Sequence, residues 1–466
     1  MRIGIVGPSY EQRSLPFDAQ RSINLFPILD QMGKEVAALY SAPGKSLFTT
    51  AGIGYIRGMF YSSGNRCFSI SGNGLYEIFS SGTSSLLGTL NTSSGNITIA
   101  ENLSQLAICD GVNLYIMPYS TNVLAKVTDP DLPASVGTVA NIDGYFVVNE
   151  VGTGRFYVSA LNDGTSWDAL SFATAESSPD VLNAVVNAVG QLWLFGEKST
   201  EIWTNVGGIF PFRRISGARL EVGILSPFSA IEIDNSVMWV GRDKFGLGIV
   251  YKAQGFSPVR VSNTPIEKRI QEATQPEKIN AFAYQEEGNT FYVLTGGGLE
   301  TSLVYDLTTQ QWHERAYLND MGNFETDLAF CHAFAFNKHL VGDRRNGNIY
   351  EMSLDFYDDG GEPLCRERIY THLSDEGTRI RYNALEIGFE TGVGLQSGQG
   401  SNPVASLALS KDGARTWIDC GTRTIGAVGR YQTKVEFRRL GVAEQMTFKI
   451  RVTDPVKVAI IGSYLK

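Results

Sequence analysis

The sequence is poor in the residues that most often carry chemistry. Only 4 His and 5 Cys occur in 466 residues, and no two cysteines have the C-x-x-C spacing. Their separation argues against the common zinc and thiol–disulfide redox motifs. Free cysteines are usually buried, so we expect isolated thiols in or near hydrophobic cores at the five positions: Cys67, Cys109, Cys331, Cys365 and Cys420.

Long apolar runs and a targeting signal are missing as well. Residues 1–14 contain neither an extended hydrophobic stretch nor a cleavage-site pattern, so no signal peptide is expected. No window reaches the roughly 18 apolar residues that a membrane helix needs. We therefore expect no membrane insertion by this chain, and a protein that stays in a cytoplasm until it is assembled into something larger.

The chain has fewer basic than acidic residues. Lys plus Arg number 39 and Asp plus Glu number 48, which gives a net charge of −9. Tight non-specific wrapping of DNA needs a basic surface, and this balance argues against it. Loose contact with double-stranded DNA remains compatible with this net charge, because an acidic wall repels the phosphates and lets a duplex slide.

Glycine and aromatic residues are abundant instead. The chain holds 50 Gly, 25 Phe and 20 Tyr. Glycine serves tight turns and aromatic residues favour strands, so the composition predicts an all-β protein rich in hairpins. One short helix is expected over 264–274, with Thr264 as N-cap and Pro265 in the first helical position. The β-branched run in 178–190 favours a strand there.

A loose unit recurs along the chain. A turn with Gly or Asn leads into a short strand in which an aromatic residue lies between aliphatic ones, as in 71–82, 141–150 and 286–297. Successive units are mostly separated by a distance close to the ~40–50 residues of a four-stranded propeller blade. The pattern predicts a β-propeller of about six blades over residues 51–360.

The two ends of the chain do not share this pattern. Strand-like stretches on either side of a Gly/Ser/Gln-rich loop at 388–403 predict a C-terminal β-sandwich over 361–466. Residues 1–50 are expected to form an extended N-terminal arm that crosses or leads into the first blade. The arm and the loop at 391–403 are expected to become ordered on docking to partners.

The most specific local motif lies in the expected sandwich. Residues 410–417 match S-x-D-G-x-x-T-W, which resembles the Asp-box hairpin of sialidases and of other propeller and sandwich proteins. Ser410 begins the motif. Asp412 is expected to accept bonds from the amides of its own turn, Gly413 to permit the backbone reversal, and Trp417 to pack beneath the hairpin.

Two further Asp–Trp pairs have a similar interpretation. Asp163 and Trp167 form a weaker relative of the same motif, and Asp306 ends an expected strand shortly before Trp312. Each aspartate suits the amides of a turn, and each tryptophan supplies packing surface. Acid–base chemistry by Asp306 with His313 is the alternative, which the position inside a repeat disfavours.

Tests for catalytic motifs are negative. The segment at 42–46 contains G-K-S but has Leu39 where a P-loop needs its first Gly. Residues 55–58 lack the aromatic-Arg-Ile-Pro pattern that usually carries the first arginine of a sialidase. His332 and His339 are expected to be ordinary strand histidines. We assign no catalytic, cofactor-binding or metal residue, and expect no enzyme and no cofactor.

A family resemblance covers nearly the whole chain. The stretches IDGYFVVNEVGTGRFYVSALNDGTSWDALSF, LWLFGEKSTEIWTNVGGIFPF and DNSVMWVGRDKFGLGIVY follow one another within 141–270. RSINLFPI near the start and VTDPVKVAIIGSYL near the end extend the match. In order and spacing these stretches resemble the packaged-DNA stabilization proteins of tailed phages, the tail accessory or tail-nozzle factors of short-tailed phages.

The resemblance implies a structural virion protein of the phage tail, assembled in the cytoplasm of the bacterial host. It implies a homo-oligomeric ring, usually of six copies, below the portal and its adaptor. Such a ring continues the DNA channel, closes it after packaging, touches the double-stranded DNA loosely, and carries the tail tip, spikes or fibres.

Two alternatives stay open at this point. One is a propeller-type adhesin of a tail fibre, in which exposed aromatic residues such as Trp167 or Trp203 stack on a host glycan. The other is a sialidase-like hydrolase, which the missing motifs make the weaker candidate.

Overall fold

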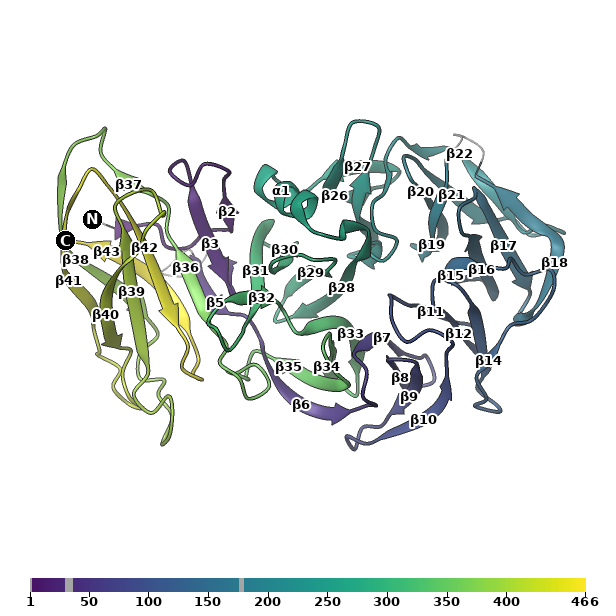
Figure 1. Cartoon of the computed structure of the whole chain (residues 1–466), viewed down its shortest axis with the longest axis horizontal. Coiled ribbons are helices and arrows are strands. Elements are labelled where there is room, and N and C mark those ends of the chain that lie inside the picture. Colours follow the sequence, from purple (N-terminus) through teal and green to yellow (C-terminus); the bar gives the residue numbers. More distant parts are fainter. Residues whose placement is uncertain (1, 30–36, 176–179) are drawn as a thin grey trace.

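The computed structural model describes residues 2–29, 37–175 and 180–466, and strands dominate it. Figure 1 shows two bodies along the long axis: a ring of radiating sheets and, at the other end, a compact pair of sheets. The ring is a β-propeller and the smaller body is a β-sandwich. Both the all-β class and this combination are as predicted.

The described residues form seven blades, each built on four antiparallel strands, and in the first six these strands follow one another along the chain. The first three contain β7 (Ile56–Tyr61), β8 (Cys67–Ser71), β9 (Gly74–Ile78) and β10 (Ser84–Thr89); β11 (Thr98–Glu101), β12 (Gln105–Cys109), β13 (Leu114–Pro118) and β14 (Ala125–Lys126); and β15 (Val136–Ile142), β16 (Tyr145–Glu150), β17 (Arg155–Ala160) and β18 (Asp163–Thr174).

The next three blades carry short extra strands. They contain β19 (Leu182–Ala188), β20 (Gln191–Gly196), β21 (Thr200–Asn205) and β22 (Phe212–Leu220); β24 (Ile231–Ile233), β25 (Ser236–Arg242), β26 (Leu247–Gln254) and β27 (Ser257–Arg260), with β23 (Gly223–Ile224) beside β25; and β28 (Ile279–Glu286), β29 (Asn289–Gly296), β30 (Ser302–Asp306) and β31 (Gln311–Leu318), with β32 (Phe324–Thr326) beside β31. The strand expected within 178–190 is β19, and residues 178 and 179 lie outside the described residues.

The seventh blade is built from both ends of the propeller sequence. It takes β33 (Ala329–Ala335), β34 (Lys338–Asp343) and β35 (Asn348–Ser353) from the late part of the chain, and its outermost strand is β6 (Gly44–Thr50). The innermost strands β33 and β7 are neighbours, which closes the ring. The expected number of about six blades therefore becomes seven, because the strand that completes the last blade precedes the first one in sequence.

Side-chain hydrogen bonds tie some of the innermost strands to the next blade. Thr98 Oγ1 on β11 accepts the amide of Val139 on β15 at 3.0 Å, and Thr138 Oγ1 on β15 accepts the amide of Val185 on β19 at 2.9 Å. An inner strand has no backbone partner on its axial side, so its amides need other acceptors. Polar residues on the inner strands therefore serve the closure of the ring.

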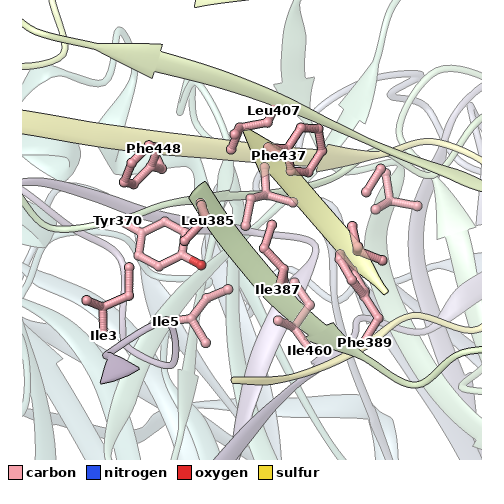
Figure 2. Close-up of a cluster of buried hydrophobic side chains, with 14 of the residues drawn as sticks. Ile3, Ile5, Tyr370, Leu385, Ile387, Phe389, Leu407, Phe437, Phe448 and Ile460 are labelled. Carbon is pink, nitrogen blue, oxygen red and sulfur yellow. The ribbon is translucent and has the colours of Figure 1, made fainter. Parts of the chain in front are cut away.

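The sandwich consists of two sheets. One contains β1 (Arg2–Ile3), β4 (Leu25–Leu29), β5 (Ala37–Ser41), β43 (Ala459–Leu465), β38 (Ile380–Phe389) and β41 (Val435–Ala443); the other contains β36 (Arg366–Ile369), β42 (Gln445–Val452), β39 (Val404–Ser410) and β40 (Ile418–Thr424), with β37 (Leu373–Ser374) beside β42. Every second residue of these strands faces inward, as two packed sheets require. Figure 2 shows the resulting core, in which Ile3 and Ile5 lie among Leu385, Phe437 and Phe448.

The first 50 residues differ from the expected arm. β1 pairs with β43, the hairpin of β4 and β5 joins the same sheet, and β6 completes the seventh blade. β2 (Tyr10–Glu11) pairs with β3 (Ala19–Ile23). The described part of this segment belongs to both folded bodies, because its alternating apolar residues fill the sandwich core and its backbone groups pair with strands of both.

One continuous sheet crosses from propeller to sandwich. β3 pairs in parallel with β31, the outermost strand of the sixth blade, and on its other side pairs antiparallel with β36 of the sandwich. The predicted boundary between residues 360 and 361 falls between β35 and β36. Strand pairing thus fixes the two bodies to each other, with no hinge on this path.

The N-cap of the helix lies one residue earlier than expected. In α1 (Thr264–Glu272) the N-cap is Asn263, in an extended conformation, and its side chain accepts the amide of Ile266 at 3.2 Å. Thr264 is already helical, and Pro265 fits the first turn because it has no amide hydrogen to satisfy. A 3₁₀ turn, Pro276–Lys278, follows.

Candidate functional site

The Asp-box-like turn closes the hairpin of β39 and β40. Asp412 Oδ1 accepts the amides of Arg415 at 3.1 Å and Thr416 at 2.9 Å, and Asp412 Oδ2 accepts Thr416 Oγ1 at 2.5 Å. Ser410 Oγ donates to Asp412 Oδ1 at 2.8 Å and accepts the amide of Ala414 at 2.9 Å. The bonds from Thr416, followed by that from Ser410, hold the pKa of Asp412 well below its ordinary value.

The same turn packs against the N-terminal segment. Gly413 has a φ of 73°, and a Cβ added there would lie 2.8 Å from Pro16 Cγ. Ala414 has a φ of 66°, where many Asp-boxes have a second glycine. Trp417 is half-buried, and Lys449 Nζ lies 4.4 Å from the centre of its ring. The geometry is that of a turn that buries part of the N-terminal segment.

The second Asp–Trp pair lies in the third blade. Asp163 Oδ1 accepts the amide and the hydroxyl of Thr165 at 2.9 and 2.6 Å, and these bonds, the hydroxyl's first, lower the pKa of Asp163. Trp167 is only 6% exposed, and its Nε1 donates to the carbonyl of Gly164 at 2.9 Å. A ring buried to this degree presents no face to a sugar.

The third pair lies in the sixth blade. Asp306 is fully buried, with Oδ1 accepting the amide of Thr308 at 2.9 Å and Oδ2 accepting Thr309 Oγ1 at 2.8 Å. Burial raises the pKa of Asp306. Trp312 is buried between the sixth blade and the region of the helix at 264–272. Its Nε1 donates to the carbonyl of Val261 at 2.9 Å. Both groups are occupied within the fold.

The histidines do not form a catalytic dyad with these aspartates. His313 lies opposite Val304 in the pairing of β30 with β31, and its ring packs on Phe26 at 6.0 Å between centroids. His332 and His339 share a hydrogen bond of 3.0 Å between adjacent strands, and burial lowers the pKa of His332 to about 3. Among the described residues, no group of three or more His, Cys, Asp and Glu has the arrangement to hold a metal ion.

All five cysteines are free thiols, four of them buried, with Cys420 half-buried. Burial raises the pKa of Cys109 and of Cys331 to about 12. Thiols that stay protonated in this way are poor nucleophiles. They act as small packing residues.

A polar cluster that has no local signal in the sequence lies where the two bodies meet. Glu314 on β31 is fully buried and binds Arg21 of β3 at 2.5 Å and Arg269 of α1 at 2.6 Å. Glu11 of β2 pairs with the same two arginines at 3.4 and 3.0 Å. The guanidinium groups hold the pKa of Glu314 well below its usual range, against the opposing effect of burial.

Asn24 completes this junction. Its Nδ2 donates to the carbonyls of Ala316 and Cys365, both at 2.8 Å, and its Oδ1 accepts the amide of Ala316 at 3.0 Å. The residue has a φ of 54°, a left-handed conformation that asparagine tolerates better than most residues. A single side chain thus links the N-terminal segment, the sixth blade and the start of the sandwich.

Two buried arginines of β36 donate hydrogen bonds to oxygen atoms of the N-terminal segment. Arg368 donates to the carbonyls of Ile5 at 2.7 Å and Pro8 at 3.0 Å, and to Gln20 Oε1 at 2.7 Å. Arg366 donates to Ser41 Oγ at 2.9 Å. Burial lowers the pKa of both arginines to about 10. Both remain charged at neutral pH, so their guanidinium groups bind the segment as charged donors.

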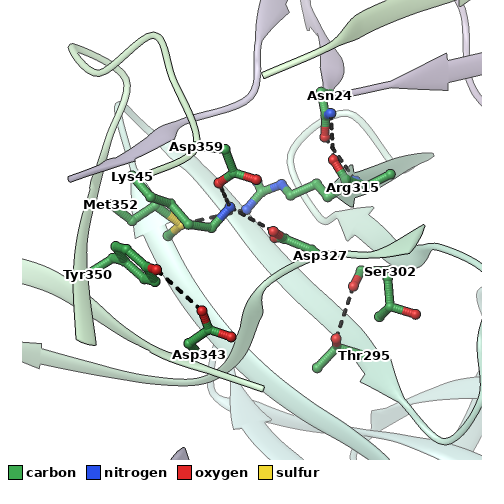
Figure 3. A network of polar contacts seen from close by, with 12 residues as sticks. Asn24, Lys45, Thr295, Ser302, Arg315, Asp327, Asp343, Tyr350, Met352 and Asp359 are labelled. Atoms are coloured by element: carbon green, nitrogen blue, oxygen red, sulfur yellow. Dashed lines mark hydrogen bonds and ion pairs between the residues drawn. The ribbon is translucent and has the colours of Figure 1, made fainter. Parts of the chain in front are cut away.

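A second buried ionic cluster anchors the closing strand (Figure 3). Lys45, at the start of β6, lies 2.6 Å from Asp327 and 2.7 Å from Asp359, and all three side chains are 3% exposed or less. The two carboxylates hold the pKa of Lys45 above its ordinary value despite burial. Nothing in the local sequence marks these residues, because the three partners are far apart along the chain.

The axis of the propeller holds a cavity of about 630 Å³, lined by the innermost strand of every blade. Pro227 and Phe228, in the segment that leads into β24, line this cavity and also a smaller one of about 210 Å³ on the opposite side. The carbonyl of Phe228 accepts the amide of Ala281 at 2.9 Å, which fixes the segment to β28.

No helix in the described parts of the chain is long and apolar enough to cross a membrane. The fold defines the architectural class: a β-propeller joined by paired strands to a β-sandwich, with buried ion pairs that hold distant strands together.

Family comparisons agree with this class. Residues 1–357 match the family model described as the β-propeller of bacteriophage P22 Gp10, and residues 366–466 match the model described as its β-sandwich. The chain belongs to the family of the phage P22 Gp10 protein, and is a Gp10-like structural protein of the phage tail. A search of curated proteins gave no match.

Several solved structures are similar at low identity. They include a computationally designed protein, Ika8 (15% identity, TM-score 0.39, 74% of this chain and 98% of that one), and the extracellular domain of the hybrid two-component system BT4673 of B. thetaiotaomicron (11%, 0.45, 89% and 59%). A chain of the Mitotic Checkpoint Complex also matches (10%, 0.45, 70% and 95%). Likeness at this level carries no argument about function.

Proposed function

We propose that this protein forms a homo-oligomeric ring, of six copies in keeping with the resemblance, below the portal and adaptor of a short-tailed phage. The ring continues the DNA channel, closes it after packaging, and carries other tail proteins. The observation that carries the proposal is the continuous sheet through β31, β3 and β36. A subunit whose two bodies cannot hinge suits a ring that must hold pressurised DNA.

In this proposal the DNA channel lies between subunits. The axial cavity has a volume of only about 630 Å³, which is too small to admit a duplex whose major groove alone is about 12 Å wide. The walls of the channel are expected to be mixed or acidic, since a net charge of −9 gives loose contact with DNA. Assembly takes place in the bacterial cytoplasm, and the mature location is the virion tail.

A closed ring needs heterologous contacts, in which one patch meets a different patch on the next subunit. The described N-terminal strands are already paired within the subunit, so they are unavailable as docking arms. The loop at 391–403 also bonds to itself, with the amide of Leu395 donating to the carbonyl of Gly400 at 2.8 Å. In this proposal the contacts between subunits come from preformed turns and strand edges.

The proposal assigns no catalytic activity to the chain. The carboxylates of Asp412, Asp163 and Asp306 are all saturated by groups of their own turns. The aromatic side chain named for glycan stacking, Trp203, packs edge-to-face on Phe156 at 5.2 Å and donates to Glu201 at 2.9 Å. These contacts favour the structural role over an adhesin or a hydrolase.

Electron microscopy of the purified protein mixed with its portal–adaptor complex tests the proposal. A ring of density at the distal end of the complex is the expected result. Protein that remains monomeric and unattached at saturating concentration would refute the ring and the channel together. A glycan array run in parallel, with binding in place of assembly, would support the adhesin instead.

A further inference from the structure

Charge is divided unequally between the two parts of the chain. Residues 361–466 hold 15 basic and 11 acidic residues, which gives them a net charge of +4. Residues 1–360 hold the other 24 basic and 37 acidic residues, which gives a net charge of −13. Opposite charges attract across an interface and like charges repel. This division therefore favours contacts in which the sandwich of one copy meets the propeller of another.

The positive charge gathers at one edge of the sandwich. β40 and β41 are the last strands of the two sheets, and Arg423 Nε on β40 donates to the carbonyl of Glu436 on β41 at 3.0 Å. Figure 1 shows both strands in the part of the sandwich that lies away from the propeller. Five exposed basic residues, which we call the basic edge, lie on β41 and in the turns that lead into β40 and β41: Lys411, Arg415, Arg430, Lys434 and Arg439.

The carboxylates next to the basic edge are mostly occupied. Asp412 is saturated by its own turn, and Glu436 lies 2.6 Å from Arg438 and 2.9 Å from Lys466. Apolar side chains are exposed in the same stretch, with Tyr431 at 73% and Ile418 at 52%. A terminal strand also has backbone groups without a strand partner. The basic edge thus presents positive charge, apolar surface and backbone groups, which together fit a negatively charged protein surface.

The propeller has a face of the opposite character. In the first six blades the strands alternate in direction, so the turns after the first and third strands lie at the same end of the blade. The blades repeat around one axis, which gathers these turns on one face of the propeller, the turn face. The turns contain Asp143, Asp234, Glu287 and a single basic residue, Arg66, which Glu77 binds at 2.7 Å.

Both carboxylates and apolar groups are available on the turn face. Glu287 and Glu232, which lies on β24 next to a turn, are exposed. In the described parts of the chain, neither carboxylate and none of the cations of the basic edge has a partner of opposite charge within 4.0 Å. Leu103 and Leu161, at the tips of two turns, are 92% and 55% exposed, in positions where polar residues are usual.

The opposite face of the propeller is less suitable. The turns after the second strands lie there, and they expose Lys198 and Lys244. These cations would repel the basic edge. The turn face therefore matches the basic edge better in charge, and its exposed leucines match the exposed Tyr431 and Ile418.

We infer that the basic edge of one subunit docks on the turn face of the next, with its cations beside Glu232 and Glu287. The inference rests on the proposed ring and names the two different patches that a heterologous contact requires. The same edge-to-face contact is repeated at every interface of the ring. An acidic surface of another tail protein is the alternative occupant of the basic edge.

Two charge-reversed variants of the full chain test this contact. Arg430→Glu/Lys434→Glu places negative charge on the edge, where it faces Glu232 and Glu287. Glu232→Lys/Glu287→Lys places positive charge on the turn face, where it faces the basic edge. Each variant is mixed with the portal–adaptor complex, and rings are counted by electron microscopy. We expect each variant alone to form at least about tenfold fewer rings than wild type, because like charges then meet at every interface.

An equal mixture of the two variants is the decisive arm. Each subunit of one variant then has neighbours of the other variant, and opposite charges face each other again at every contact. We expect the mixture to form most of the wild-type number of rings. Native mass spectrometry is expected to find the two variants in equal numbers within each ring. A contact with a different tail protein gives no such recovery.

Lys198→Glu/Lys244→Glu is the matched control, since it reverses the same number of exposed charges on the opposite face. We expect it to form rings as wild type does. Circular dichroism and thermal unfolding check that each variant is folded. If a reversed variant does not fold, Gln replaces the charged residues at the same positions, and an unchanged number of rings then refutes the contact.

The outcomes separate this inference from the ring itself. Wild-type protein that forms no ring refutes the proposed function. Wild-type rings together with undiminished rings from both variants refute the edge-to-face contact and leave the ring intact. Variants that fail alone and also in the mixture refute a contact between these two patches. An equal loss in the control variant refutes the assignment to the turn face.

Discussion

Replacing Glu314 by Gln removes the negative charge that two arginines share where the propeller meets the sandwich. Glu314 is fully buried, and the side chains of Arg21 and Arg269 are 16% and 17% exposed. Breaking a buried pair by removing one partner costs about 3–5 kcal/mol, because the remaining charge stays buried. Glu11 still pairs with both arginines, so we expect a loss near the lower limit, about 3 kcal/mol.

Hydrogen exchange measures this loss at the junction itself. The amide of Asn24 donates to the carbonyl of Glu314 at 2.8 Å, and the amide of Ser9 donates to that of Trp312 at 2.8 Å. A loss of about 3 kcal/mol corresponds to roughly 100-fold faster exchange of these amides if they open locally. Peptides that cover residues 7–25 are expected to show the change, and peptides from β11 to β22 are expected to keep their protection.

The pH dependence has a definite sign. The two guanidinium groups lower the pKa of Glu314 from its ordinary value of 4.5. A lowered pKa stabilises the fold above the pKa of the unfolded state and loses that contribution as the pH falls. The difference between wild type and Glu314→Gln should therefore be full at pH 7 and shrink below about pH 4.5.

A surface variant completes the test. Glu221→Gln removes a pair with Arg219 in which the glutamate is 74% exposed, and exposed pairs are worth about 0–1 kcal/mol. If Glu314→Gln changes the exchange of the junction peptides no more than Glu221→Gln does, the argument for a buried ionic joint is wrong.

Three further predictions concern the closing strand and two turns. Lys45→Met leaves Asp327 and Asp359 buried together, so urea unfolding should show a loss of about 3–5 kcal/mol in the free energy of unfolding. This loss should grow as the pH rises from 4 to 7, because one carboxyl group must then ionise without its cation. A loss that does not depend on pH would contradict this. Gly413→Ala adds a Cβ 2.8 Å from Pro16 Cγ at a φ of 73°, whereas Gly421→Ala has a φ of 78° and nothing within 4 Å. Both share the cost of positive φ, so only Gly413→Ala should in addition expose the N-terminal segment to limited proteolysis, and equal cleavage rates would refute the contact. Val189 has a φ of 53°, strained for a β-branched residue, so Val189→Asn should raise the free energy of unfolding by about 0.5–1 kcal/mol, and a lower midpoint in urea would count against this.

Several features were accessible from the sequence because they depend on neighbours in the chain. The turn followed by an aromatic residue among aliphatic ones in segments such as 141–150 predicts a blade strand, and β16 lies there. The Asp412 turn is equally local, since Asp412 bonds to residues three and four positions later. The predicted N-cap was wrong by one residue, because Asn263 and Thr264 are both good N-cap residues and only the backbone conformation distinguishes them.

Other features had no local signal. The partners of Glu314 are 293 and 45 positions away in the sequence, at Arg21 and Arg269, and Lys45 meets Asp327 and Asp359 from the opposite end of the propeller. The seventh blade was undercounted for the same reason, since β6 pairs with β35 across about 300 residues. The axial cavity is likewise shaped by all blades at once.

By itself the sequence determined the strands, their turns and the family, because side-chain periodicity and turn chemistry are set within a few residues. The tertiary structure decided how the blades close, where the N-terminal strands pair and which charges are buried together. Those outcomes depend on backbone hydrogen bonds and ion pairs between distant segments, which exist only after the chain has brought them within a few ångströms of one another.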